Sequence, residues 1–445
     1  MKIKAKKLSV AGATIWFAFC YGGAILGYLV INGVAARLLV EDFGQFVIAV
    51  TVTSLLGQMA LMGAHRGGLR EAARLIDSDS EGAATLPRAA RAVSLLTLPA
   101  FSLGTTVAVF YVYTDTPLLM RVVLATSMGA LVWFGGQQKL WANYLRGYGQ
   151  VRFASLLEGR SGGLLVSLFQ AFFIFGILLL APEMGLSGAM AALAAGYVFP
   201  VLIAWRRVSI RWLNINVDGN LFQDLRDVVI RNWHFASNLV AGSISAAAEI
   251  WLAGLILSAV EVSQFSAAQR LSVMLSIPFV SLGVVFSPVV SRLAGHDDRR
   301  LESLLRTAAT AAGAVTALAW IPMLFLPAFL LQMVYGPWFS TAAELLVLLS
   351  FGSMTIILSG LSSTALTMSR HEAVVGYVQW MVVAARVVFG AAGATVFGAV
   401  GLAASDAAVT ALHSLTLWIL ARKRLGLRTH PTLRPAIKMM FRTRA

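Results

Sequence analysis

The sequence predicts an all-α polytopic membrane protein with about twelve transmembrane helices in two six-helix lobes. Three observations predict this fold. Of the 445 residues, 58% are hydrophobic and 12% are charged, whereas a soluble globular chain carries roughly 25% charged residues. Apolar stretches long enough to cross a bilayer recur along the chain. The basic residues between these stretches are sorted to alternate sides.

A spanning helix needs about 20 successive apolar residues, and we find twelve such segments. The segments are 9–33, 43–63, 92–113, 117–138, 155–181, 186–205, 233–258, 265–290, 305–332, 341–362, 373–397 and 399–421. The connections between them are short, and the longest stretches outside them are 64–91, 206–232 and the tail after Arg422. None of these is long enough to fold a catalytic domain, which argues against an enzyme.

The distribution of basic residues predicts the orientation. With the N-terminus in the cytoplasm, nearly all of the 35 Lys and Arg residues fall on the cytoplasmic side. Arg37 and Arg121 fall outside, and Arg270 and Arg386 lie within spans. This is the positive-inside asymmetry of bacterial inner-membrane proteins. It predicts cytoplasmic termini and explains the net charge of +15 without a nucleic-acid partner.

The domain boundaries follow from the segments. We predict an N-terminal six-helix lobe at 1–210, a cytoplasmic connector at 211–232, a C-terminal six-helix lobe at 233–421 and a basic tail at 422–445. Within the connector, apolar residues recur at spacings of three and four from Leu221 to Trp233, as in a helix lying in the headgroup plane. An ordinary basic connector is an equally good interpretation.

Neither a metal site nor a cofactor site is predicted. Cys20 is the single cysteine, so there is no disulfide framework and no thiolate cluster. The six histidines are scattered without the spacing of metal ligands.

The two halves contain matching segments. Residues 40–46 resemble 260–265 where the second and eighth spans begin, and 185–191 resemble 398–404 where the sixth and twelfth begin. Both matches are six spans apart. Because six is even, the two copies enter the membrane in the same direction, which predicts parallel repeats.

Several segments resemble the corresponding segments of polysaccharide flippases. They are residues 38–46, 264–271 and 287–293, and the two Gly-x-x-Gly openings at Gly185 and Gly398. These flippases belong to the multidrug/oligosaccharidyl-lipid/polysaccharide exporter (MOP) superfamily. The resemblance implies two lobes around a central cavity. It also implies movement of an undecaprenyl-diphosphate-linked oligosaccharide to the periplasmic leaflet, for lipopolysaccharide or exopolysaccharide synthesis. Polysaccharide assembly proteins would then be partners, alongside the lipid bilayer.

Four charged residues inside predicted spans are the substrate-binding candidates, since a charge at a helix centre costs about 2.5–3.5 kcal/mol to insert. They are Glu249, Arg270, Arg386 and Asp406. Counting residues from the outer helix ends places Glu249 and Arg270 at similar depth, and likewise Arg386 and Asp406, so each pair could meet. The two pairs are either structural ion pairs or sites where an arginine binds the diphosphate through parallel hydrogen bonds.

Further candidates lie elsewhere. Arg66, Arg70 and Arg146 would collect anionic substrate at the inner mouth, although positive-inside sorting explains them equally well. Gly22, Gly23 and Gly27 in the first span are candidates for a bendable gating helix, with close helix packing as the alternative. We expect the headgroup to pass from the inner mouth to Arg386 and then to Arg270.

Two other functions stay open. A drug/cation antiporter of the same architecture needs a titratable carboxylate, and Glu249 or Asp406 would serve only without an arginine partner. The N-terminal half has no deep carboxylate, which favours the flippase. A membrane glycan polymerase or ligase is disfavoured because no large outer loop is present.

Overall fold

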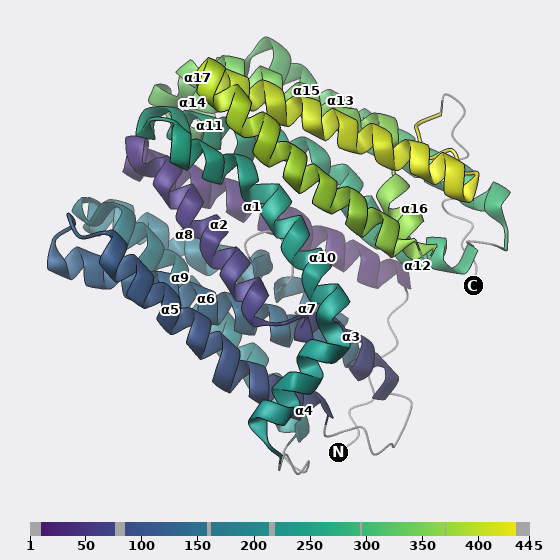
Figure 1. Ribbon diagram of the computed structural model, residues 1–445, viewed down its shortest axis with the longest axis horizontal. Coiled ribbons are helices and arrows are strands. Elements are labelled where there is room, and N and C mark those ends of the chain that lie inside the picture. The colour runs from purple at the N-terminus through teal and green to yellow at the C-terminus, as the bar shows by residue number, and fades with distance from the viewer. Residues whose placement is uncertain are drawn as a thin grey trace. The chain divides into compact units, whose positions relative to one another are not determined.

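The computed structural model describes residues 10–75, 85–157, 162–212, 219–293, 296–369 and 371–432, and within these ranges the regular secondary-structure elements are all helices, joined by short turns and loops (Figure 1). The first unit contains α1 Val10–Leu39, α2 Phe43–Ala60, α3 Ala64–Leu75, α4 Thr85–Ala92, α5 Leu98–Val112, α6 Leu118–Gly147, α7 Val151–Leu157, α8 Gly163–Leu180 and α9 Gly185–Ser209. The long helix α10 Leu221–Ile256 follows. The remaining helices are α11 Ala259–Ser272, α12 Ile277–Leu293, α13 Asp298–Phe325, α14 Pro327–Tyr335, α15 Ala343–Ser359, α16 Ser362–Met368 and α17 Glu372–Leu425.

In the described residues, 10 helical stretches are long and apolar enough to cross a membrane. Two of these each contain two predicted spans. The stretch Phe19–Ala60 is interrupted at Val40, where φ is +48°, and Glu372–Leu425 is interrupted at Gly398, where φ is 61° and ψ is −144°. All twelve predicted segments are therefore represented, and the prediction of an all-α polytopic fold is confirmed.

Local sequence explains where several helices begin. Ser258 and Glu261 form a capping box at the start of α11: the Ser258 hydroxyl accepts from the Glu261 N–H, and the Glu261 carboxylate accepts from the Ser258 N–H. Asp297 caps α13 by accepting from the Arg300 N–H. Both caps satisfy amide groups that a helix N-terminus leaves without an intrahelical partner.

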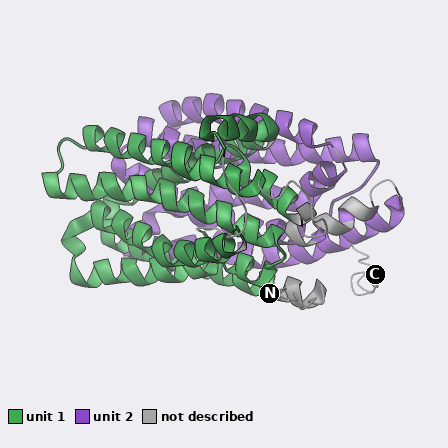
Figure 2. Ribbon diagram, turned by 90° about the horizontal axis from the view of Figure 1, so that it is seen from below, with its two compact units in different colours: residues 1–243 green, residues 244–445 purple. Residues whose placement is uncertain are grey.

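The chain divides into two compact units, residues 1–243 and 244–445 (Figure 2). The division falls inside α10, because the predicted interfacial helix of the connector continues without a break into the seventh span. The start of the tail packs within the second unit, where the Thr429 hydroxyl donates to the Ser359 carbonyl at 2.7 Å. Residues 433–445 lie outside the described part of the chain.

The matching segments at the sixth and twelfth spans have matching backbones. Gly185 has φ 49° and ψ −129°, and Gly398 has φ 61° and ψ −144°. Both glycines start the last span of their half, in a conformation that disfavours residues with a Cβ. The helix packing agrees, since α6 packs on α9 in the first unit and α15 packs on the last part of the chain, α17, in the second.

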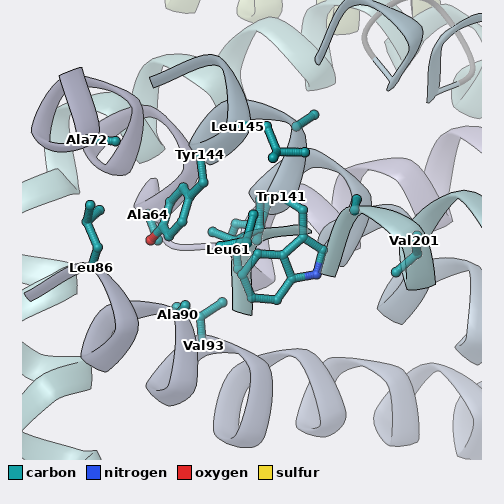
Figure 3. Packing of buried hydrophobic residues seen from close by; sticks show 14 of the residues in the cluster. Leu61, Ala64, Ala72, Leu86, Ala90, Val93, Trp141, Tyr144, Leu145 and Val201 are labelled. Atoms are coloured by element: carbon teal, nitrogen blue, oxygen red, sulfur yellow. The ribbon is translucent and has the colours of Figure 1, made fainter. Parts of the chain in front are cut away.

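An aromatic core fills one end of the first unit, which we call its basic end because α3, α4 and the end of α9 carry arginines there (Figure 3). Tyr144 is fully buried, and Trp212 lies 5.9 Å from the Trp141 ring and 6.1 Å from the Tyr144 ring. The Trp212 indole donates to the Tyr148 hydroxyl at 2.9 Å. This core holds α3, α4 and the start of α10 against α6.

The glycines of the first span have different surroundings. A Cβ on Gly23 would lie 2.7 Å from Leu164 Cδ1, and one on Gly27 would lie 2.6 Å from Ser167 Cβ, so these two glycines let α1 and α8 pack closely. A Cβ on Gly22 would meet nothing within 4 Å. Gly22 is therefore the position where helix bending can be tested separately from helix packing.

We expect Gly27→Ala to lower stability by about 1–3 kcal/mol through overpacking, and Gly22→Ala to leave stability unchanged or slightly raised because alanine favours the helix. Membrane abundance and thermal unfolding of the purified variants measure this difference. Transport by Gly22→Ala then tests the hinge proposal: reduced transport at normal abundance is expected, and unchanged transport would remove Gly22 from it.

Candidate functional site

A buried charge cluster in the second unit joins three of the four predicted substrate-binding candidates. The Arg386 Nη1 group donates to Asp406 Oδ1 at 2.8 Å and also pairs with Glu249 Oε1. Its Nη2 group donates to the Thr410 hydroxyl at 2.9 Å, and that hydroxyl donates in turn to Asp406 Oδ1 at 3.3 Å. The Glu249 side chain is 1% exposed, and those of Arg386 and Asp406 are each 13% exposed.

A side chain of α10 contacts α17 near these charges. A Cβ on Gly390 would lie only 3.0 Å from Leu252 Cδ1, so the Leu252 side chain reaches α17 at that point. Glu249 is three residues before Leu252, and Arg386 is four residues before Gly390, so each charge shares a helix face with the contact. Glu249 and Arg386 therefore lie on the helix faces that meet at this contact.

The cluster has more carboxylates than cations. Arg386 supplies one positive charge between Glu249 and Asp406, so the ionised cluster carries an excess negative charge. Glu249 Oε2 is buried and has no hydrogen-bond partner in the described chain. Because an uncompensated charge is costly in the membrane interior, binding of a proton or another cation would neutralise the cluster.

One expected pairing is confirmed and the other is wrong. Arg386 pairs with Asp406 as expected, but Glu249 pairs with Arg386 and not with Arg270. Arg270 is buried in α11, where Tyr335 of α14 is its electrostatic neighbour. Counting residues from a helix end gives depth in the membrane but not rotation about the helix axis, and rotation decides which neighbour a side chain meets.

A second polar cluster lies at the basic end of the first unit. His65 in α3 is 4% exposed, and burial together with the charges of Lys139 and Arg66 lowers the pKa of His65 to about 3. His65 is therefore neutral at physiological pH. Arg66 is exposed, and no carboxylate among the described residues pairs with Arg66 or Lys139.

Sequence reasoning missed Lys139. The fourth predicted span ends at residue 138, which places Lys139 in a loop, but α6 continues to Gly147. A signal was available in Gln137 and Gln138, which precede Lys139 and are both buried in α6. A run of three polar residues that continues an apolar helix indicates a polar face turned toward protein or water.

The other predicted residues at this end are Arg146 and Arg70. The Arg146 guanidinium lies 5.5 Å from the centre of the Phe17 ring. Arg70 lies in α3, and its side chain is outside the described part of the structure. None of the described residues form a group of three or more His, Cys, Asp or Glu side chains suited to a metal ion.

Solved structures match nearly the whole chain, although no family model and no curated protein matches it. A MATE family multidrug-resistance transporter of the MOP superfamily, in an inward-facing conformation, matches with a TM-score of 0.61 at 17% identity, over 97% of this chain and all of that one. The chain has the MOP transporter fold. An outward-facing MATE transporter matches with a TM-score of 0.54 at 16% identity, over 94% of this chain and 96% of that one.

A MOP superfamily transporter from Pyrococcus furiosus, described as having a binding pocket of reverse polarity, matches with a TM-score of 0.60 at 16% identity, over 94% of this chain and 95% of that one. Identities this low establish the fold and leave the substrate open. The two six-helix lobes that the MOP fold contains agree with the repeats found in the sequence. The resemblance to polysaccharide flippases is thus supported at the level of the superfamily fold.

Proposed function

We propose that this protein is a transporter that flips an undecaprenyl-diphosphate-linked oligosaccharide from the cytoplasmic to the periplasmic leaflet of the bacterial inner membrane. It would serve the synthesis of a surface polysaccharide, with both termini in the cytoplasm as the distribution of basic residues suggests. The observation that carries the proposal is the pair of cations Arg66 and Lys139, which has no carboxylate partner in the described chain.

The substrate's chemistry matches this cluster. A lipid-linked diphosphate is anionic and its sugars are too polar for the hydrocarbon core, whereas its polyprenyl tail can stay in lipid. Two nearby cations with no carboxylate partner among the described residues attract such a headgroup and raise its local concentration. Arg386 offers less, because its guanidinium is already shared between Glu249 and Asp406. We therefore propose the first phosphate contact at Arg66 and Lys139, and a later one at Arg270.

The test replaces the two cations. We expect Arg66→Gln with Lys139→Gln to reduce transport at least about tenfold, because two charge-assisted hydrogen bonds of about 1.5–3 kcal/mol each are removed. Export of the glycan by a deletion strain carrying the variant measures this, with membrane abundance recorded in parallel. Proteoliposomes containing a lipid-linked oligosaccharide give the same measurement on purified protein.

Arg121→Gln is the matched control, since Arg121 lies at the opposite end of the first unit, beside the Phe110 ring. Its transport should equal that of the wild type. Lys139→Arg should retain most of the activity because the charge is kept. Full transport by the double variant at normal abundance would contradict the proposal.

The charge cluster in the second unit favours one alternative, a drug/cation antiporter. The excess carboxylate at Glu249 and Asp406 could carry a proton or cation, as an antiporter requires, and MATE transporters are among the proteins of similar fold. Reconstituted protein distinguishes the two. Proton release on adding a cationic drug would favour the antiporter, and movement of lipid-linked oligosaccharide without the drug would favour the flippase.

A further inference from the structure

A cavity of about 110 Å³ lies within the basic end of the first unit, separate from both charge clusters. Four helices line it: α3, α4, α6 and the first part of α10. This volume is several times the volume that one water molecule needs. It has room for one small polar molecule and not for a chain of sugars.

Glycines in α3 leave space for two of the cavity's polar side chains. A Cβ on Gly67 would overlap the Asn232 amide, and one on Gly68 would overlap the Tyr144 ring. Any larger residue at either position would force these side chains to move. Figure 3 shows Tyr144 reaching from α6 toward Ala64 of α3, with Leu86 of α4 nearby.

Several polar atoms at the cavity are not used by the protein. The Tyr144 side chain is fully buried, and its hydroxyl has no hydrogen-bond partner among the described residues. Arg88 Nε is also buried without a partner there. The Asn232 amide nitrogen donates to the Val228 carbonyl at 2.9 Å, which leaves the amide oxygen as an acceptor. Buried polar atoms normally have a partner, so these point to a bound molecule.

The charges around the cavity restrict what that molecule can be. The lining includes three carboxylates, those of Glu71, Asp224 and Asp227, and two guanidinium groups, those of Arg88 and Arg231. Asp227 and Arg231 face each other at 3.6 Å. A free anion would be repelled by the remaining carboxylates, and a free cation would be repelled by Arg88. A neutral ligand with several hydroxyl groups avoids both costs, because each hydroxyl can donate to a carboxylate or accept from Arg88 or Tyr144.

We propose that this cavity binds one uncharged sugar residue, with the Tyr144 hydroxyl and Arg88 as donors and Glu71, Asp224 and the Asn232 amide as acceptors. The inference rests on the proposed function in one respect, that the sugar belongs to the transported headgroup. A bound sugar would also tie the start of α10 to α3 and α4, and α10 continues directly into the second unit.

The test uses the purified full-length protein in lipid nanodiscs, with free N-acetylglucosamine and free galactose as probes. Saturation-transfer NMR should detect binding of at least one sugar to the wild type at millimolar concentration. Tyr144→Phe should weaken that binding roughly fivefold, the effect of one lost hydrogen bond. This variant should fold normally, because the hydroxyl it removes has no partner among the described residues. Tyr148→Phe is the control, since Tyr148 accepts from Trp212 and does not line the cavity.

Three results would overturn the proposal. One is absence of sugar binding to the wild type, which would leave a cavity filled with water only. Another is equal sugar binding by Tyr144→Phe and wild type. The third is binding of inorganic phosphate or putrescine that depends on Tyr144 while neither sugar binds. Failure of the proposed function is seen separately, as full glycan export by the Arg66→Gln, Lys139→Gln variant, and does not depend on sugar binding.

Discussion

Replacing Arg386 with glutamine should destabilise the second unit by about 3–5 kcal/mol, the usual cost of breaking a buried ion pair from one side. The change leaves Glu249 and Asp406 facing each other without the cation that both contact. Membrane abundance and the melting temperature of the detergent-solubilised protein should both fall. Arg226→Gln is the control, because Arg226 is exposed near the start of α10, and it should unfold at the wild-type temperature.

The three-residue cluster also determines which second change rescues stability. Adding Asp406→Asn to Arg386→Gln should recover part of the loss, and adding Glu249→Gln as well should recover most of it, because all three charges of the cluster are then removed. A combined Glu249→Gln, Arg270→Gln variant should show no such rescue, since those residues do not pair. An Arg386→Gln protein as stable as the wild type would show that the cluster contributes nothing to folding.

Replacing Gly401 with alanine should cost about 3 kcal/mol, the upper part of the usual overpacking range. A Cβ there would overlap the carbonyl oxygen of Gly393 and lie 2.7 Å from Phe397 Cβ. The two halves of α17 lie close together at this point, on either side of the turn at Gly398. Because the obstacle is backbone, a rotamer change cannot relieve it, and the two spans would have to separate.

Gly104→Ala provides the matched control, since a Cβ on Gly104 in α5 would meet nothing within 4 Å. It should unfold at or slightly above the wild-type temperature, because alanine favours a helix. The difference between Gly401→Ala and Gly104→Ala in thermal unfolding measures the close approach within α17. Equal stability of the two variants would mean that the twelfth span does not need to pack so closely on the eleventh.

Much of the fold could be predicted from the sequence because the membrane imposes a strong local rule. A span needs a long apolar run whose backbone groups bond within the helix, so each run can be recognised without knowing its neighbours. The breaks are also local. Gly398 lies between two predicted spans, and its backbone conformation is one that a glycine adopts readily.

Helix ends were less predictable where polar residues continue a span. The apolar run in α6 stops before Gln137, Gln138 and Lys139, but the helix does not. These residues stay in the helix because their side chains find partners elsewhere in the protein. The Gln138 side chain, for example, donates to the Leu157 carbonyl of α7. Hydropathy alone cannot identify this compensation, because the partner comes from another helix.

The sequence by itself determined the helical class, the twelve segments, the repeated turn glycines and the four charged residues that lie within predicted spans. Only the tertiary structure decided that Arg386 serves both carboxylates, that Lys139 joins Arg66 and His65, and that Tyr144 lines a polar cavity. The physical reason is that apolar character and depth are properties of one segment. The partner of a buried charge depends on the rotation and packing of two or three helices, as the contacts of Arg386 with both Glu249 and Asp406 show.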